Sequence, residues 1–195
     1  MLDLINGETV TLPHFDFGIG KRVNGRTLKV GKEEPIIIEG IHALNDELTI
    51  SIPKSNKFKI FISPQAQINL DDHNPLSLTD LRLVRRIVRD KKFRNSPAEE
   101  TLSMWPKVRA GEFRWIYSTQ EGSDYVYNSF LPYELPVMKK YAMPLLSSID
   151  KESVYYPDAQ RLLHMLKFFI DMSDEWVPSN SLMREFIGGS CYADV

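Results

Sequence analysis

The sequence predicts an α/β fold, a partial parallel sheet with flanking helices. Short aliphatic runs typical of strands alternate with longer segments that have the apolar spacing of helices. Two runs, 35–40 and 58–62, have the pattern of strands, and 124–128 is a weaker third. Parallel sheets commonly contain about five or six strands. We therefore expect the chain to form part of a larger domain.

The extended segments before residue 41 are of two kinds, a hairpin and a buried strand. Residues 6–13 read as a turn and a short extended segment, and 24–30 as the turn and second arm of a hairpin. In 35–40, three consecutive isoleucines stand between a proline and a glycine. Such a run predicts a strand that is buried on both faces, as parallel sheets require.

Four segments between and after the strands predict helices. They span 78–93, 98–115, 136–146 and 158–171. The first carries an apolar face at Leu81, Val84, Ile87 and Val88. Pro106 predicts a kink in the second.

Composition excludes several classes of protein. Among 195 residues there is one cysteine, Cys191, which excludes a disulfide framework and every multi-cysteine zinc pattern. The net charge of −2 gives no overall attraction to nucleic acid or anionic membranes. No apolar run approaches the ~20 residues that span a bilayer. We expect a cytoplasmic protein without a membrane partner, for which nucleic acid is not the ligand.

Glu39 is a candidate metal ligand. It is followed by glycine at the carboxyl end of the predicted 35–40 strand, where open α/β sheets bind ligands. A carboxylate there commonly holds Mg²⁺ beside the phosphates of a nucleotide. The alternative is an ordinary solvated glutamate.

The predicted 78–93 helix and its end are rich in arginine. The residues are Arg82, Arg85, Arg86, Arg89 and Arg94. Four of them fall on one side at helical spacing, with only Asp80 and Asp90 as accompanying acids. Guanidinium groups suit phosphoryl oxygens because each offers a planar fork of donors that stays charged. The excess favours anion binding over the alternative, a solvated helix face.

Phe15, Asp16 and Phe17 form a candidate site for a base or sugar, since flat apolar rings flank a carboxylate. The alternative is a loop whose aromatic rings fill the core. A phosphate-binding loop is missing. The pattern G-x-x-x-x-G-K-[ST] fails around Gly20, because phenylalanine stands at position 15 and Arg22 replaces the final Ser or Thr.

Taken in order, these pieces resemble the uridine kinase and phosphoribulokinase family of phosphate-loop kinases. Residues 13–22 are similar to its P-x-Y-D-F-x-x-x-x-R segment, and 36–41 to its strand-E-G-I segment. Residues 85–94 are similar to its R-R-x-x-R-D-x-x-x-x-R lid helix. The resemblance implies that 1–148 form the C-terminal portion of a nucleoside kinase-like domain. It implies that 149–195 form a helical C-terminal extension packed on that portion.

The resemblance implies a kinase that transfers the γ-phosphoryl group of ATP, with Mg²⁺, to a hydroxyl of a nucleoside or a related small molecule. The residues it implies are Glu39 for Mg²⁺; Arg86, Arg89 and Arg94 for the ATP phosphates and the transferring group; and Phe15, Asp16 and Arg22 for the nucleoside.

The departures from the family pattern are equally specific. The phosphate loop and the acidic base of the family lie upstream of the matched region, so we expect this chain to be inactive without the missing N-terminal segment of a parent chain. Gly20 and Met104 replace base-contacting residues, and Ser96 replaces the last lid arginine, which leaves the phosphate acceptor open. The alternative is a non-catalytic binding or interaction module with a kinase-like half fold. Apolar surface left exposed by absent strands would favour a homo-oligomer.

Overall fold

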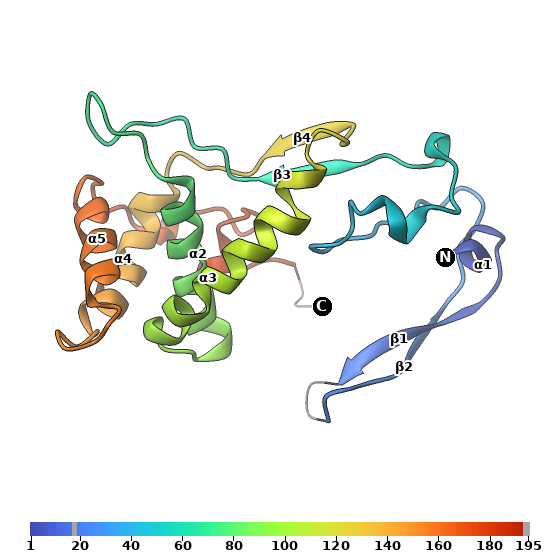
Figure 1. Cartoon of the computed structure of the whole chain (residues 1–195), viewed down its shortest axis with the longest axis horizontal. Helices are drawn as coiled ribbons and strands as arrows, with labels where there is room; N and C mark the ends of the chain where they lie inside the picture. The colour runs from blue at the N-terminus through green and yellow to red at the C-terminus, as the bar shows by residue number, and fades with distance from the viewer. Residues whose placement is uncertain (17–18, 193–195) are drawn as a thin grey trace.

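The computed structural model describes residues 1–16 and 19–192, which form a helical body, a small parallel sheet and an N-terminal hairpin (Figure 1). The helices are α1 (Leu2–Ile5), α2 (Leu78–Arg94), α3 (Ala98–Trp115), α4 (Glu134–Ser147), α5 (Tyr156–Lys167) and α6 (Arg184–Ile187). Short 3-10 turns are η1 (Asp46–Thr49), η2 (Lys54–Asn56), η3 (Tyr117–Thr119) and η4 (Asp174–Trp176). The strands are β1 (Val10–Asp16), β2 (Lys21–Leu28), β3 (Ile60–Ser63) and β4 (Tyr125–Asn128). The mixed α/β class is confirmed.

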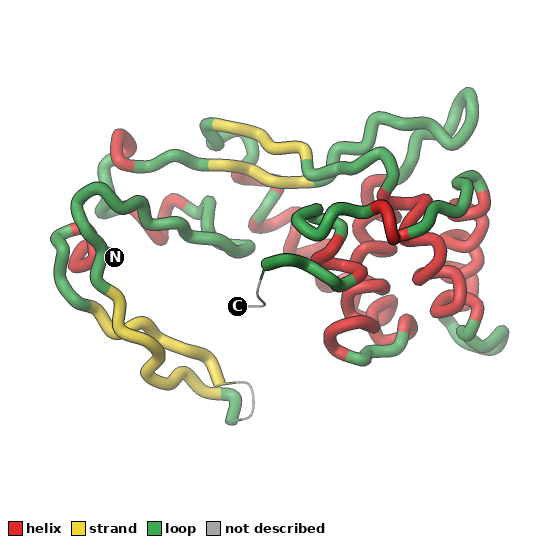
Figure 2. Tube along the Cα trace, turned by 180° about the vertical axis from the view of Figure 1, so that it is seen from behind, coloured by secondary structure: helices red, strands yellow, loops and turns green. Residues whose placement is uncertain are grey.

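A hairpin is present as predicted, but its expected turn at Asn24 and Gly25 is wrong, because both residues lie within β2. Strands β1 and β2 pair antiparallel, and the register shifts between Thr11 and Pro13, where proline lacks the N–H that a ladder needs. A Cβ at Gly25 would lie 2.9 Å from the Leu12 carbonyl oxygen, so this close approach requires glycine. The hairpin lies away from the helical body in both views (Figures 1 and 2).

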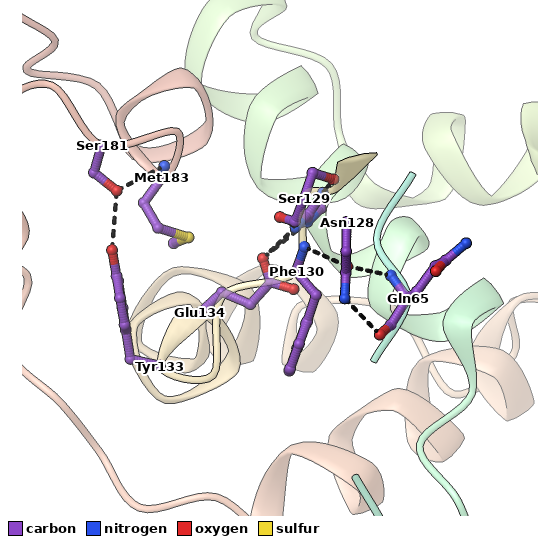
Figure 3. A network of polar contacts seen from close by, with 9 residues as sticks. Gln65, Asn128, Ser129, Phe130, Tyr133, Glu134, Ser181 and Met183 are labelled. Carbon is purple, nitrogen blue, oxygen red and sulfur yellow. Dashed lines mark hydrogen bonds and ion pairs between the residues drawn. The ribbon is translucent and has the colours of Figure 1, made fainter. Parts of the chain in front are cut away.

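The strands predicted at 58–62 and 124–128 are confirmed as β3 and β4, and the structure pairs them in parallel. Ile60 lies opposite Tyr125, and Ser63 opposite Asn128, with α2 and α3 in the crossover between the strands. The side chain of Asn128 extends the pairing (Figure 3): it accepts from Gln65 N at 2.8 Å and donates to Gln65 O at 3.0 Å.

The predicted strand at 35–40 is wrong. The segment is irregular, and the side chain of Ile37 is 88% exposed. A strand buried on both faces needs neighbouring strands and a helical layer on each side. Within 1–16 and 19–192, the parallel sheet contains β3 and β4 alone, so this segment has neither.

The core lies between α2, α4 and α5, and the four predicted helices are confirmed. α2 packs against α4, which in turn packs against α5, and the residues of the apolar face of α2 are fully buried. Ser77 caps α2 by accepting from Asp80 N at 3.3 Å, and Asn95 ends it in the left-handed conformation. Pro106 lies within α3 without ending it, and α5 ends at Lys167, earlier than predicted. No helix in the described ranges is both long and apolar enough to cross a membrane.

An ion pair holds the C-terminal segment on α4. Lys140 donates to one oxygen of Asp174 at 2.8 Å, and the Tyr141 hydroxyl donates to the other. The hydrogen bond from Lys140, followed by that from Tyr141, lowers the pKa of Asp174 to about 2. The folded state therefore favours the charged carboxylate.

We predict that Asp174→Asn lowers the free energy of unfolding at pH 7 by about 1 kcal/mol, after allowance for the solvent that reaches the pair. Because the pKa is depressed in the folded state, this stabilisation is present above the ordinary pKa of 3.8 and is lost as pH falls toward about 2. Urea denaturation at pH 7 and at about pH 2–3 measures both effects. Asp171→Asn, at an exposed carboxylate nearby, is the control and should change little. A pH-independent difference between wild type and Asp174→Asn would contradict the assignment.

Candidate functional site

An open pocket of about 190 Å³ lies beside α2, where α3 and α6 complete its wall. Its lining contains five arginines, two acids and three apolar or aromatic residues. They are Arg82, Arg85, Arg86, Arg89, Arg94, Asp90, Glu112, Trp105, Val108 and Phe186. The structure thus brings the three arginines predicted to bind phosphate into one cavity.

Two buried carboxylates orient four guanidinium groups. Asp90 lies 3.1 Å from Arg86 Nε, accepts from Arg94 Nη1 at 2.8 Å, and accepts from Thr101 Oγ1 at 3.2 Å. Asp90 therefore balances one of the two positive charges that it contacts. Glu112 does the same for Arg82 and Arg109, so the cluster keeps a net positive charge.

The second carboxylate is Glu112 of α3. It accepts from Arg82 Nη2 at 2.5 Å on one oxygen and from Arg109 Nη1 at 2.5 Å on the other. Glu112 is almost fully buried, and its contact with Arg82 joins α3 to α2 along the pocket.

Arg85 has a structural role that distinguishes it from its neighbours. Its buried guanidinium donates to Glu134 Oε2 at 2.5 and 3.0 Å and to the Ser129 carbonyl at 2.8 Å, and it lies over the ring of Phe186. Figure 3 shows Ser129 and Glu134 side by side at the start of α4. Burial raises the pKa of Glu134 to about 7, against the opposing effect of Arg85. This pair joins α2 to the β4–α4 connection.

The pocket retains donors without a hydrogen-bond acceptor. Within the described part of the chain, Arg86 Nε and Trp105 Nε1 are buried and have no hydrogen-bond partner. Arg86 Nε is close enough to Asp90 for charge attraction, but the two atoms are not aligned for a hydrogen bond. The guanidiniums of Arg89 and Arg94 are about half exposed, so an anion can reach them. The donor set fits phosphate oxygens.

The residues predicted for the nucleoside lie on the hairpin. Phe15 lies directly opposite Arg22, and Asp16 accepts from Ile19 N at 3.3 Å. Phe17, the other aromatic residue of this motif, lies outside the described residues. Figures 1 and 2 place the hairpin far from α2, so the structure does not bring this set and the arginines together.

Glu39 is exposed in the irregular 35–40 segment. The residues after it pack on α3, where the ring of His42 lies edge-on to Trp115 at 5.0 Å between centroids. Among the residues described, no three His, Cys, Asp or Glu side chains converge as metal ligands do. A single carboxylate does not supply the several oxygen ligands that Mg²⁺ needs, so the donors present do not fit the ion. The metal-binding role of Glu39 stays a prediction.

Several pocket residues were not predicted from the sequence to have a role there. The ion pairs of Asp90 could have been predicted, because Arg86, Asp90 and Arg94 stand at successive i, i+4 positions. Glu112 and Phe186 come from distant segments and carry no such local pattern.

Comparison with curated proteins finds similarity to uridine kinases. The chain is 27% identical to a uridine kinase of Halalkalibacterium halodurans over 124 residues, 63% of this chain and 51% of that protein. It is 30% identical to a uridine kinase of Clostridium perfringens over 105 residues, 54% and 42% of the two chains. The chain is similar to part of each of these uridine kinases. It is also 29% identical to the Macrococcus caseolyticus uridine kinase over 125 residues, 64% and 52%.

The chain spans about half the length of the curated relatives it matches. No family model matches it. No solved structure matches it either.

We predict that Arg85→Gln destabilises the chain by about 3–5 kcal/mol, because it leaves the Glu134 carboxylate buried without its cation. Urea denaturation measures the loss. Arg94→Gln is the matched control: its exposed side chain should change stability by about 1 kcal/mol or less. Replacement of both partners, Arg85→Met with Glu134→Leu, should restore much of the stability. Equal midpoints for Arg85→Gln and wild type would refute the structural role.

Proposed function

We propose that this chain is part of an ATP-dependent kinase that phosphorylates a nucleoside or a related small-molecule hydroxyl. The arginine pocket is its phosphate-binding region. The observation that carries the proposal is a cavity lined by five arginines whose lining acids are both buried and already shared between guanidinium groups. The similarity to uridine kinases supports the reaction class.

The proposed chemistry is charge stabilisation by Arg86, Arg89 and Arg94. Guanidinium N–H groups bind phosphate oxygens in charge-assisted hydrogen bonds, and they stabilise the charge that spreads over the transferring phosphoryl group. A volume of about 190 Å³ is below the ~300–1,000 Å³ of pockets that enclose whole ligands. The pocket therefore suits the phosphate portion of ATP, with the rest of the nucleotide outside it.

In the complete protein, we assign Phe15, Asp16 and Arg22 to the nucleoside. Phe15 and Arg22 lie opposite each other in the register of the hairpin, and an aromatic ring with a guanidinium is a combination that can stack on a base and hydrogen-bond to it. Because the hairpin lies away from the arginine pocket, the active arrangement requires the hairpin to pack elsewhere.

The sheet supports the view that a further segment completes the domain. Strands β3 and β4 expose Ile60, Ile62 and Tyr127, and each strand has one open edge within the described structure. Apolar faces and open edges of this kind are normally covered by more strands or helices. We assign that cover to the N-terminal segment of a longer parent chain, which would also supply the phosphate loop.

We predict that the chain binds tripolyphosphate, measured by calorimetry, and that the affinity falls as salt is added, because exposed charges are screened. Arg94→Gln should weaken binding about ten- to a hundredfold, the effect of a lost charge-assisted hydrogen bond. Arg26→Gln, at an exposed arginine of the hairpin, is the control and should bind like wild type. The absence of measurable binding by wild type would refute a phosphate pocket.

In a longer protein that contains the phosphate loop, Arg89→Gln should lower kcat/KM for phosphoryl transfer from ATP to uridine by ~10². Steady-state kinetics measure this, with Arg26→Gln again as the control. If the longer protein binds tripolyphosphate but Arg89→Gln leaves its kinetics unchanged, the alternative of a non-catalytic binding module gains support.

A further inference from the structure

Helix α6, from the C-terminal part of the chain, is held in one position against α2. Arg184 donates to the carbonyls of Asp174 at 3.0 Å and Val177 at 2.5 Å. Phe186 is buried in the core. Gly188 ends α6 at a φ of +83°, and a Cβ there would lie 2.9 Å from Lys92 Cε on α2. These contacts fix which side chains of α6 face the arginine pocket.

One side chain of α6 lines this pocket, and the preceding one contacts an arginine of its lining. Phe186 lines it and lies 5.2 Å below the guanidinium of Arg85. Glu185 lies at the rim, with Oε1 3.2 Å from Arg89 Nη1. A segment 96 residues further along the sequence therefore places a carboxylate on one of the proposed phosphate-binding arginines.

The Arg89–Glu185 pair differs from the other ion pairs of the cluster. Its two side chains are 47% and 45% exposed, whereas Asp90, Glu112 and Glu134 are buried. An ion pair in contact with water contributes little to stability, so it opens easily. A buried carboxylate cannot leave its arginine without a large desolvation penalty. Arg89 is therefore an arginine that the fold can release to a ligand.

We propose that Glu185 is a built-in competitor for the phosphate ligand at Arg89. Carboxylate and phosphate oxygens accept hydrogen bonds from the same guanidinium N–H groups, so the two exclude each other at this donor. After displacement, the Glu185 carboxylate stays near the bound anion and repels it. Glu185 thus lowers the affinity of the pocket and selects for anions charged enough to displace it. This inference depends on the proposed function of the pocket.

The test compares tripolyphosphate binding to the full chain and to Glu185→Gln by calorimetry at fixed salt. Glu185→Gln should bind about two- to fivefold more tightly, as expected for loss of a weak exposed competitor. Glu175→Gln removes an exposed carboxylate of the same C-terminal region and should bind like wild type. In an Arg89→Gln background, the gain from Glu185→Gln should shrink, because the contested donor is gone. Urea denaturation checks that each variant is folded.

The outcomes separate this inference from the proposed function. If wild type binds tripolyphosphate and Glu185→Gln binds equally or more weakly, Glu185 is not a competitor, while the phosphate pocket stands. Equal gains from Glu185→Gln and Glu175→Gln would show a general charge effect and also overturn the inference. If neither wild type nor Glu185→Gln binds, both the pocket and the competitor are refuted.

Discussion

The buried ion pair between Arg85 and Glu134 is the contact on which the arrangement of the other elements depends. It joins the middle of α2 to the first turn of α4, and the Ser129 carbonyl that shares the guanidinium immediately follows β4. Because α2 and β4 are parts of one β–α–β crossover, this contact sets the position of the parallel strands relative to the helical body. The apolar face of α2 lies in the core beside it, and the remaining arginines face the pocket.

The pocket holds buried carboxylates that are each shared between two arginines. Asp90 and Glu112 are buried and each contacts two guanidinium groups, so the arginines are positioned before any anion arrives. Such preorganisation reduces the entropy lost on binding. The net positive charge remains because the carboxylates are shared. In this arrangement, the exposed Glu185 is the acid that an incoming phosphate group can displace, which would make the C-terminal region part of the site.

The sheet is less complete than the helical body. The helices enclose a core, whereas β3 and β4 leave apolar side chains and strand edges in contact with solvent. The hairpin lies apart from both (Figures 1 and 2). The matched uridine kinases are about twice as long as the part aligned with this chain. A longer protein in which further strands cover β3 and β4 would account for the exposed surface and for the absent phosphate loop together.

The sequence by itself determined what depends on neighbours in the chain. Helical periodicity placed Arg86, Arg89 and Arg94 on one face of α2. A hairpin was also predicted, but its turn was expected at Asn24 and Gly25, which lie within β2. The isoleucine run at 35–40 misled because a buried strand exists only if distant strands pair with it, and its own composition cannot supply them. The tertiary structure alone decided that Glu112 and Glu185 meet the arginines and that the hairpin stands away from them. Such contacts join segments separated by tens of residues, and they depend on how the core packs.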